Sequence, residues 1–108
     1  MDAADRVAEY YRCLDADEYD TLRSLLDPEF VQRRPDRQFA DREAFLTFMR
    51  SQRPVSETTH EISAICASVR GQAAYGTLCD SDGEVLFEFI DVFAFGDDGR
   101  ITELDTYS

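Results

Sequence analysis

The stretch Glu84–Phe95, EVLFEFIDVFAF, constrains the fold more than any other part of the chain. Strand side chains alternate between two faces, so this stretch predicts a strand with two largely apolar faces. The first face carries Val85, Phe87, Phe89, Asp91, Phe93 and Phe95. The opposite face carries Glu84, Leu86, Glu88, Ile90, Val92 and Ala94. Because an unpaired buried carboxylate costs several kcal/mol, Asp91 must be protonated, paired or open to a cavity. A hydrogen bond to a helix end or a tyrosine, with no further role, is the alternative interpretation.

Glycine-containing turns divide the second half of the chain into strands. The turns are Arg70-Gly71, Ser81-Asp82-Gly83 and Gly96–Gly99, and each is a hairpin signal. They predict strands at about 58–69, 73–80, 84–95 and 100–107. Consecutive hairpins of this kind form an antiparallel meander.

The first half of the chain has helical spacing instead. Val7, Tyr10, Tyr11 and Leu14 predict a helix over 3–16. Tyr19, Leu22, Leu25 and Leu26 predict a shorter helix closed by Pro28, and Phe30-Val31 indicates a short strand. Asp41 is the expected N-cap of a third helix that ends before Pro54. Helices that precede an antiparallel sheet predict a single α+β domain over residues 1–108.

The charge of the chain limits its partners. There are 23 Asp and Glu residues against 11 basic residues, all of them Arg, and the formal net charge is −12. A surface this acidic repels phosphate backbones and anionic lipid, so we expect neither nucleic acid nor membranes as partners. An excess of acids with Arg in place of Lys is typical of salt-loving organisms, although an ordinary acidic protein has the same balance. No apolar run reaches the roughly 20 residues of a membrane span and the N-terminal segment is acidic, which predicts a cytoplasmic protein.

The cysteines and the single histidine predict no metal site and no cofactor. Cys13, Cys66 and Cys79 are odd in number and lack paired spacing, so we expect reduced, buried thiols. His60 is the only histidine and opens the first long strand. It lies either at a cavity mouth or on the surface at the end of a strand.

Two segments carry a family resemblance that covers essentially the whole chain. The chain resembles the SnoaL-like branch of the nuclear transport factor 2-like superfamily in two segments, YYRCLDADEYDTLRSLLDPEF near the start and DVFAFGDDGRITEL near the end. The resemblance implies a cystatin-like cone, in which three helices pack in the concave face of a curved antiparallel sheet of four long strands and one short strand. It also implies an apolar cavity and dimers formed through the outer face of the sheet. Isomerases, cyclases, dehydratases and noncatalytic carriers share this fold, so the fold does not decide the function.

The ketosteroid isomerases of this superfamily offer a more specific comparison. The resemblance places Tyr10 on their oxyanion tyrosine and Asp91 on their protonated acid. Arg34 occupies the position of their catalytic base, and a guanidinium cannot abstract a proton at neutral pH. Arg34 could instead pair with Asp91 and hold it ionised. In the SnoaL-like cyclases an aspartate of the last strand is the acid/base, and here Thr106 aligns with it while Asp105 faces the other side.

The predicted site follows from the fold and these matches. The side chains expected around the cavity are Tyr10, Arg34, His60, Phe87, Phe89, Asp91 and Phe93. Arg33, Arg37 and Arg42 near its rim could orient an anion, or could simply neutralise acidic neighbours.

Three functions fit this site. The first is binding of a small hydrophobic molecule, carbonyl-bearing or anionic, without catalysis. The second is an isomerase or lyase in which Tyr10 and Asp91 stabilise an enolate. In the third, aromatic side chains fill the cavity and the domain only dimerises. The apolar outer-face residues Leu86, Ile90 and Val92 motivate the expected homodimer.

Overall fold

Three helices and a six-stranded sheet form the part of the chain that the structure, a computed structural model, describes, residues 1–53 and 57–108. The helices are α1 (Ala3–Asp15), α2 (Tyr19–Leu25) and α3 (Arg42–Ser51). The strands are β1 (Leu26–Arg33), β2 (Gln38–Phe39), β3 (Thr59–Ser68), β4 (Gly71–Cys79), β5 (Val85–Phe95) and β6 (Ile101–Tyr107). This arrangement confirms the α+β class and the element order predicted from the sequence.

Helices α1 and α3 each begin beside an aspartate that caps them. Asp2 and Asp5 form a capping box at the start of α1, with the Asp2 carboxylate accepting from the Asp5 N–H at 2.8 Å. Asp41 caps α3 by accepting from the Ala44 N–H at 2.8 Å. The third helix ends at Ser51, and Pro54, its predicted limit, lies outside the described residues.

The sheet differs from the prediction in two respects. It has six strands rather than five, because the two-residue strand β2 was not predicted, and it is mixed rather than wholly antiparallel. Its strand order is β2-β1-β6-β5-β4-β3, and β1 runs parallel to β6 while the other neighbours are antiparallel. Hairpins force antiparallel pairing, but β1 and β6 come from distant parts of the chain and no turn sets their direction. Pro28 was expected to close the second helix, but it lies inside β1, at an irregularity of the pairing where its missing N–H is tolerated.

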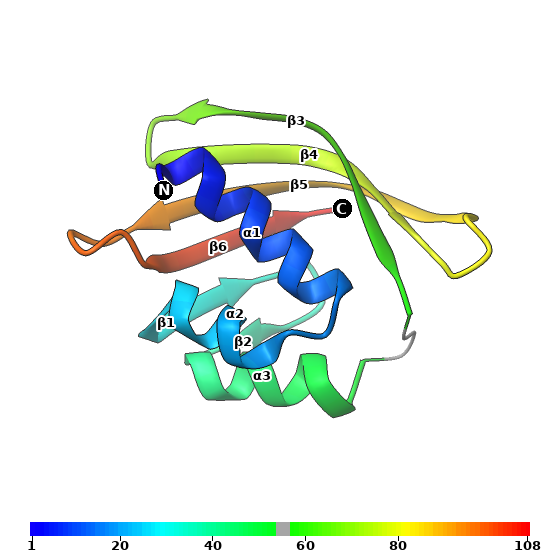
Figure 1. The fold of residues 1–108 in the computed structure, drawn as a ribbon, viewed down its shortest axis with the longest axis horizontal. Helices are drawn as coiled ribbons and strands as arrows, with labels where there is room; N and C mark the ends of the chain where they lie inside the picture. Colours follow the sequence, from blue (N-terminus) through cyan, green and yellow to red (C-terminus); the bar gives the residue numbers. More distant parts are fainter. Residues whose placement is uncertain (54–56) are drawn as a thin grey trace.

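Helix α1 crosses the concave face of the sheet, while α2 and α3 lie beside β1 and β2 (Figure 1). The core therefore forms where α1 meets the sheet and α3. Phe30, Phe45, Phe93 and Leu104 are fully buried there, and Tyr10 packs against the rings of Phe45 and Phe93. No helix of the described residues is long and apolar enough to cross a membrane.

A bulge interrupts the alternation at the start of β5. Cys79 pairs with Val85 and Leu78 pairs with Phe87, so Leu86 has no partner on β4. Both Leu86 and Phe87 line a cavity on the concave side. The predicted place of Leu86 on the outer face is therefore wrong, because strict alternation does not continue through a bulge.

The prediction of three buried cysteines is correct for two of them. Cys13 and Cys79 are buried, but Cys66 is exposed. Cys66 belongs to β3, one of the two edge strands of the sheet, and pairs with Ala73 on the single neighbour of that strand, β4.

We expect Phe45→Ala to lower the free energy of unfolding by about 3–5 kcal/mol, because Phe45 is fully buried against Phe30 and Phe39. Urea denaturation followed by circular dichroism measures the loss. Phe87→Ala is the matched control, since Phe87 is 38% exposed and should cost only about 1 kcal/mol. Equal losses for the two variants would contradict this location of the core.

Candidate functional site

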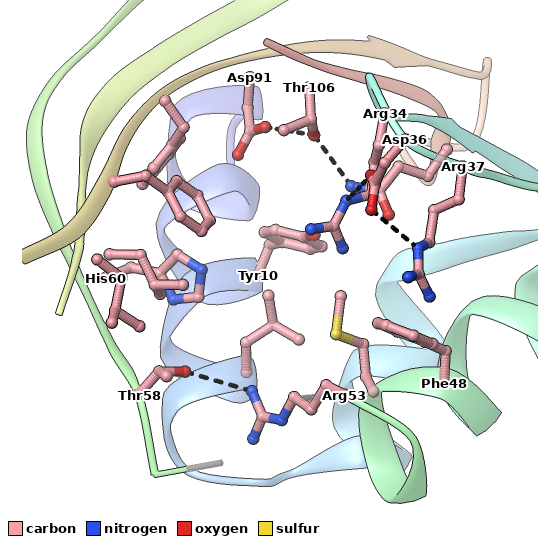
Figure 2. A pocket seen from close by; sticks show the side chains of 17 residues that line it. Tyr10, Arg34, Asp36, Arg37, Phe48, Arg53, Thr58, His60, Asp91 and Thr106 are labelled. Carbon is pink, nitrogen blue, oxygen red and sulfur yellow. Dashed lines mark hydrogen bonds and ion pairs between the residues drawn. The ribbon is translucent and has the colours of Figure 1, made fainter. Parts of the chain in front are cut away.

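A cavity of about 340 Å³ opens between α1, α3 and the concave face of the sheet (Figure 2). Its apolar lining residues are Leu14, Phe48, Met49, Leu78, Leu86, Phe87 and Phe89. Its polar and charged lining residues are Tyr10, Gln32, Arg34, Asp36, Arg37, Arg53, Thr58, His60, Asp91 and Thr106. The aromatic residues of the chain therefore do not fill the space, contrary to the third function considered from the sequence.

Asp91 is buried at the end of this cavity and is held by two hydroxyl groups. It is 5% exposed, and Tyr11 Oη and Thr106 Oγ1 each donate to its carboxyl group at 2.6 Å. Gln32 Nε2 donates in turn to Thr106 Oγ1 at 2.9 Å. Burial raises the pKa of Asp91, while the hydrogen bonds from Thr106 and Tyr11 act in the opposite direction. Asp91 is thus both hydrogen-bonded and open to the cavity.

The tyrosine that bonds Asp91 is Tyr11, not the aligned Tyr10. Tyr10 lines the cavity, and its hydroxyl group has no hydrogen-bond partner among the described residues. Burial and the nearby Asp91 raise the pKa of Tyr10 well above its usual value, and Arg34 opposes them. The phenol is therefore a neutral donor that remains available inside the cavity.

Arg34 lines the cavity but does not pair with Asp91, so the pairing considered from the sequence is absent among the described residues. Its nearest carboxylate is Asp36, with Nε 3.8 Å from Oδ1. The Arg34 N–H donates to the Arg37 carbonyl at 2.8 Å. Arg34 Nε is buried and has no hydrogen-bond partner within the described ranges.

The other arginines near the cavity mostly pair with acidic residues. Arg33 and Arg70 both bind Glu103 and Asp105 on the outer side of the sheet. Asp105 therefore points away from the cavity, and Thr106 points toward it, as the predicted register requires. Arg42 pairs with Glu43, and Arg37 pairs with Asp36 while also lining the cavity.

Of the three predicted phenylalanines, Phe87 and Phe89 line the cavity and Phe93 does not. Phe93 is fully buried against the rings of Tyr10 and Tyr11. The face of the strand is as predicted, but α1 covers this position, so Phe93 belongs to the core.

His60 lines the cavity and makes a contact that the sequence analysis missed. Its Nδ1 lies 2.6 Å from Asp15 Oδ1, and its N–H donates to the same carboxylate. The sequence held one signal for this partner, because Asp15 follows Tyr11 by four residues and so shares its helix face. In Figure 2, Tyr10 projects between His60 on one side and Arg34 on the other.

A sequence comparison identifies the family. A model of the SnoaL-like domain matches residues 7–104. The chain belongs to the SnoaL-like family. Among curated proteins, no sequence matches it significantly.

Solved structures agree with this family at the level of the fold. An NTF2-like protein of unknown function from Cytophaga hutchinsonii has a TM-score of 0.84 at 14% identity, covering 99% of this chain and 89% of its own. A putative ketosteroid isomerase from Kribbella flavida has a TM-score of 0.83 at 16% identity, with coverage of 96% and 75%. An LEH-like epoxide hydrolase from M. tuberculosis has a TM-score of 0.81 at 23% identity, with coverage of 97% and 80%. Identities this low show a shared fold and not a shared reaction.

We expect Asp91→Asn to become more stable relative to the wild type as the pH rises above about 4. Burial raises the pKa of Asp91 in the folded state above its unfolded value of about 3.9, so the folded state binds the proton more tightly. The wild type therefore loses stability as the pH rises from the unfolded to the folded pKa of Asp91. The asparagine variant does not titrate and keeps its stability over this range. Urea unfolding of both proteins in high salt, from pH 4 upward, measures the difference.

Asp97→Asn is the charge control for this experiment, since Asp97 is exposed in a turn and makes no side-chain hydrogen bond within the described ranges. A stability difference between Asp91→Asn and the wild type that stays constant with pH would contradict the raised pKa.

Proposed function

We propose that the cavity binds a small, mainly apolar molecule that carries a carbonyl or anionic oxygen. The observation that carries the proposal is a set of polar atoms without partners among apolar walls. Arg34 Nε is buried and has no hydrogen-bond partner within the described residues, and the Tyr10 hydroxyl has none either. Buried polar groups are ordinarily paired, so a ligand with an oxygen at this end would satisfy the donors.

Size and charge support the same ligand class. A cavity of about 340 Å³ is large enough for a small molecule, and most of the surface area that lines it is apolar. Arg34, Arg37 and Arg53 line it together with Asp36 and Asp91, so arginines outnumber carboxylates in the cavity of a chain that is strongly acidic. A molecule with an apolar body and one polar oxygen matches both features.

We expect Arg34→Gln to weaken binding of small phenols and aromatic carboxylates by about tenfold or more, because it removes the cation whose buried Nε has no hydrogen-bond partner within the described residues. A thermal-shift screen in high-salt buffer followed by calorimetric titration of the hits measures this. Arg33→Gln is the matched control, because the neighbouring residue faces the outer side and should leave affinity unchanged. Absence of binding to the wild type across the screen, or equal affinities for the two variants, would reject this function.

Catalysis is the second candidate function. Asp91, whose pKa burial raises, and the unpaired Tyr10 hydroxyl both line the cavity, and both could donate hydrogen bonds to an enolate oxygen. This supports an isomerase or lyase acting on a carbonyl compound. The position where ketosteroid isomerases have their base is Arg34 here, so this candidate needs a base from elsewhere in the cavity.

A homodimer formed through the outer face of the sheet is also proposed, since apolar side chains are exposed there. Tyr75, Ile90 and Tyr107 are 51%, 50% and 58% exposed, and they are paired neighbours across β4, β5 and β6. An apolar stripe of this kind across three strands is typical of an interface with a second copy.

We therefore expect light scattering in molar salt to give the mass of a dimer for the wild type and of a monomer for Ile90→Arg. The salt screens the repulsion between two acidic chains. Val69→Arg is the control, because Val69 is fully exposed in the turn that follows β3 and should not change the mass. A monomeric wild type under these conditions would rule out this dimer.

A further inference from the structure

We propose that Asp15 and His60 form a dyad in which His60 is the general base for removing a proton from carbon next to a carbonyl group. The proposal rests on the binding function above and supplies the base that the position of Arg34 lacks. Two elements that are far apart in the sequence build the dyad, because Asp15 ends α1 and His60 is the second residue of β3.

The hydrogen bonds of the dyad determine which nitrogen is free. The Asp15 carboxylate accepts from the His60 backbone N–H at 3.1 Å and contacts Nδ1 at 2.6 Å. An ionised carboxylate can only accept, so the proton of the neutral ring must be on Nδ1. The lone pair then lies on Nε2, which has no hydrogen-bond partner among the described residues. Asp15 is therefore a positioning residue that holds the tautomer and the orientation of the base.

The surroundings of His60 place its ring at the wall of the cavity. The ring packs against Tyr11 and Phe89, with centroids 5.1 and 5.7 Å away, and these contacts limit its rotation. His60 lines the same cavity as Tyr10 and Asp91, and in Figure 2 its ring points toward Tyr10. A bound carbonyl compound can thus contact a base on one side and hydrogen-bond donors on the other.

The proton transfer balances with these groups alone. The C–H bond next to the carbonyl breaks, the proton forms a bond to His60 Nε2, and the electron pair moves onto the carbonyl oxygen as an enolate. Tyr10 donates a hydrogen bond to that oxygen, and Asp15 stabilises the imidazolium that forms. Return of the proton from Nε2 to the same carbon gives exchange, and its return to a conjugated carbon gives isomerisation.

The tautomer of His60 can be measured directly, because His60 is the only histidine of the chain. Long-range proton–nitrogen NMR spectra of the wild type at high pH should show the proton on Nδ1. In Asp15→Asn the population should shift toward the Nε2–H form that free histidine prefers, whereas Asp20→Asn, an exposed change on α2, should leave it on Nδ1. A wild type with the proton on Nε2 would overturn the proposal.

Catalysis is tested with 2-tetralone, a bicyclic ketone with acidic hydrogens next to its carbonyl group. We expect the wild type in D₂O to exchange these hydrogens faster than an equal concentration of imidazole, by NMR. His60→Gln should lower the exchange rate by about 100-fold or more while 2-tetralone still binds in a calorimetric titration. Asp15→Asn should lower the rate and retain binding, and Asp20→Asn should exchange at the wild-type rate.

The two possible failures are distinguishable. If 2-tetralone binds but the wild type exchanges no faster than imidazole, or His60→Gln exchanges as fast as the wild type, the catalytic role is wrong and the binding function stands. If neither 2-tetralone nor the phenols and carboxylates of the screen bind, the binding function fails and the catalytic role fails with it.

Discussion

The buried carboxyl group of Asp91 is the constraint on which the arrangement of the site depends. Its two short hydrogen bonds come from Tyr11 on α1 and Thr106 on β6, so they join the helix to the middle of the sheet. Losing either donor would leave a buried carboxyl group short of partners, which is costly. The bond from Tyr11 also limits the rotation of α1 about its axis. Because Asp15 is four residues further along the same helix face, the rotation that satisfies Asp91 also brings Asp15 to His60.

The periodic parts of the fold could be predicted from the sequence, and the long-range pairings could not. Helical spacing around Val7 to Leu14 and alternation along β5 from Phe87 onward each depend on neighbours within a few residues, and both agree with the structure. The parallel pairing of β1 with β6 has no local signal, since no turn connects these strands. Pro28 is a similar case, because the same residue can end a helix or occupy an irregular edge of a strand, and only the partner strand decides between them.

The sequence predicted which faces of α1 and β5 contribute to the candidate site, but it did not predict which side chains contact one another there. Tyr10 and Tyr11 are both on the buried side of α1, about 100° apart around the axis, and spacing alone does not say which of them reaches Asp91. Phe93 shares its face with Phe87 and Phe89, but how far along β5 the helix covers that face depends on tertiary packing. The Asp15–His60 contact joins two elements that no sequence pattern connects. The sequence therefore predicted individual residues of the site, whereas the contacts between them could be identified only from the folded structure.

The net charge of −12 argues against anionic partners over long distances, yet the residues that line the cavity include more arginines than carboxylates. Charges are screened over about 8–10 Å at moderate ionic strength, so a group inside the cavity responds mainly to the residues that line it. Arg33 and Arg70 are neutralised by Glu103 and Asp105 on the outer face and contribute little there. Arg34 has a buried Nε without a hydrogen-bond partner in the described ranges, and its nearest carboxylate is 3.8 Å away. The position of Arg34 in the cavity, more than the number of arginines in the chain, therefore favours a ligand that carries a carbonyl or anionic oxygen.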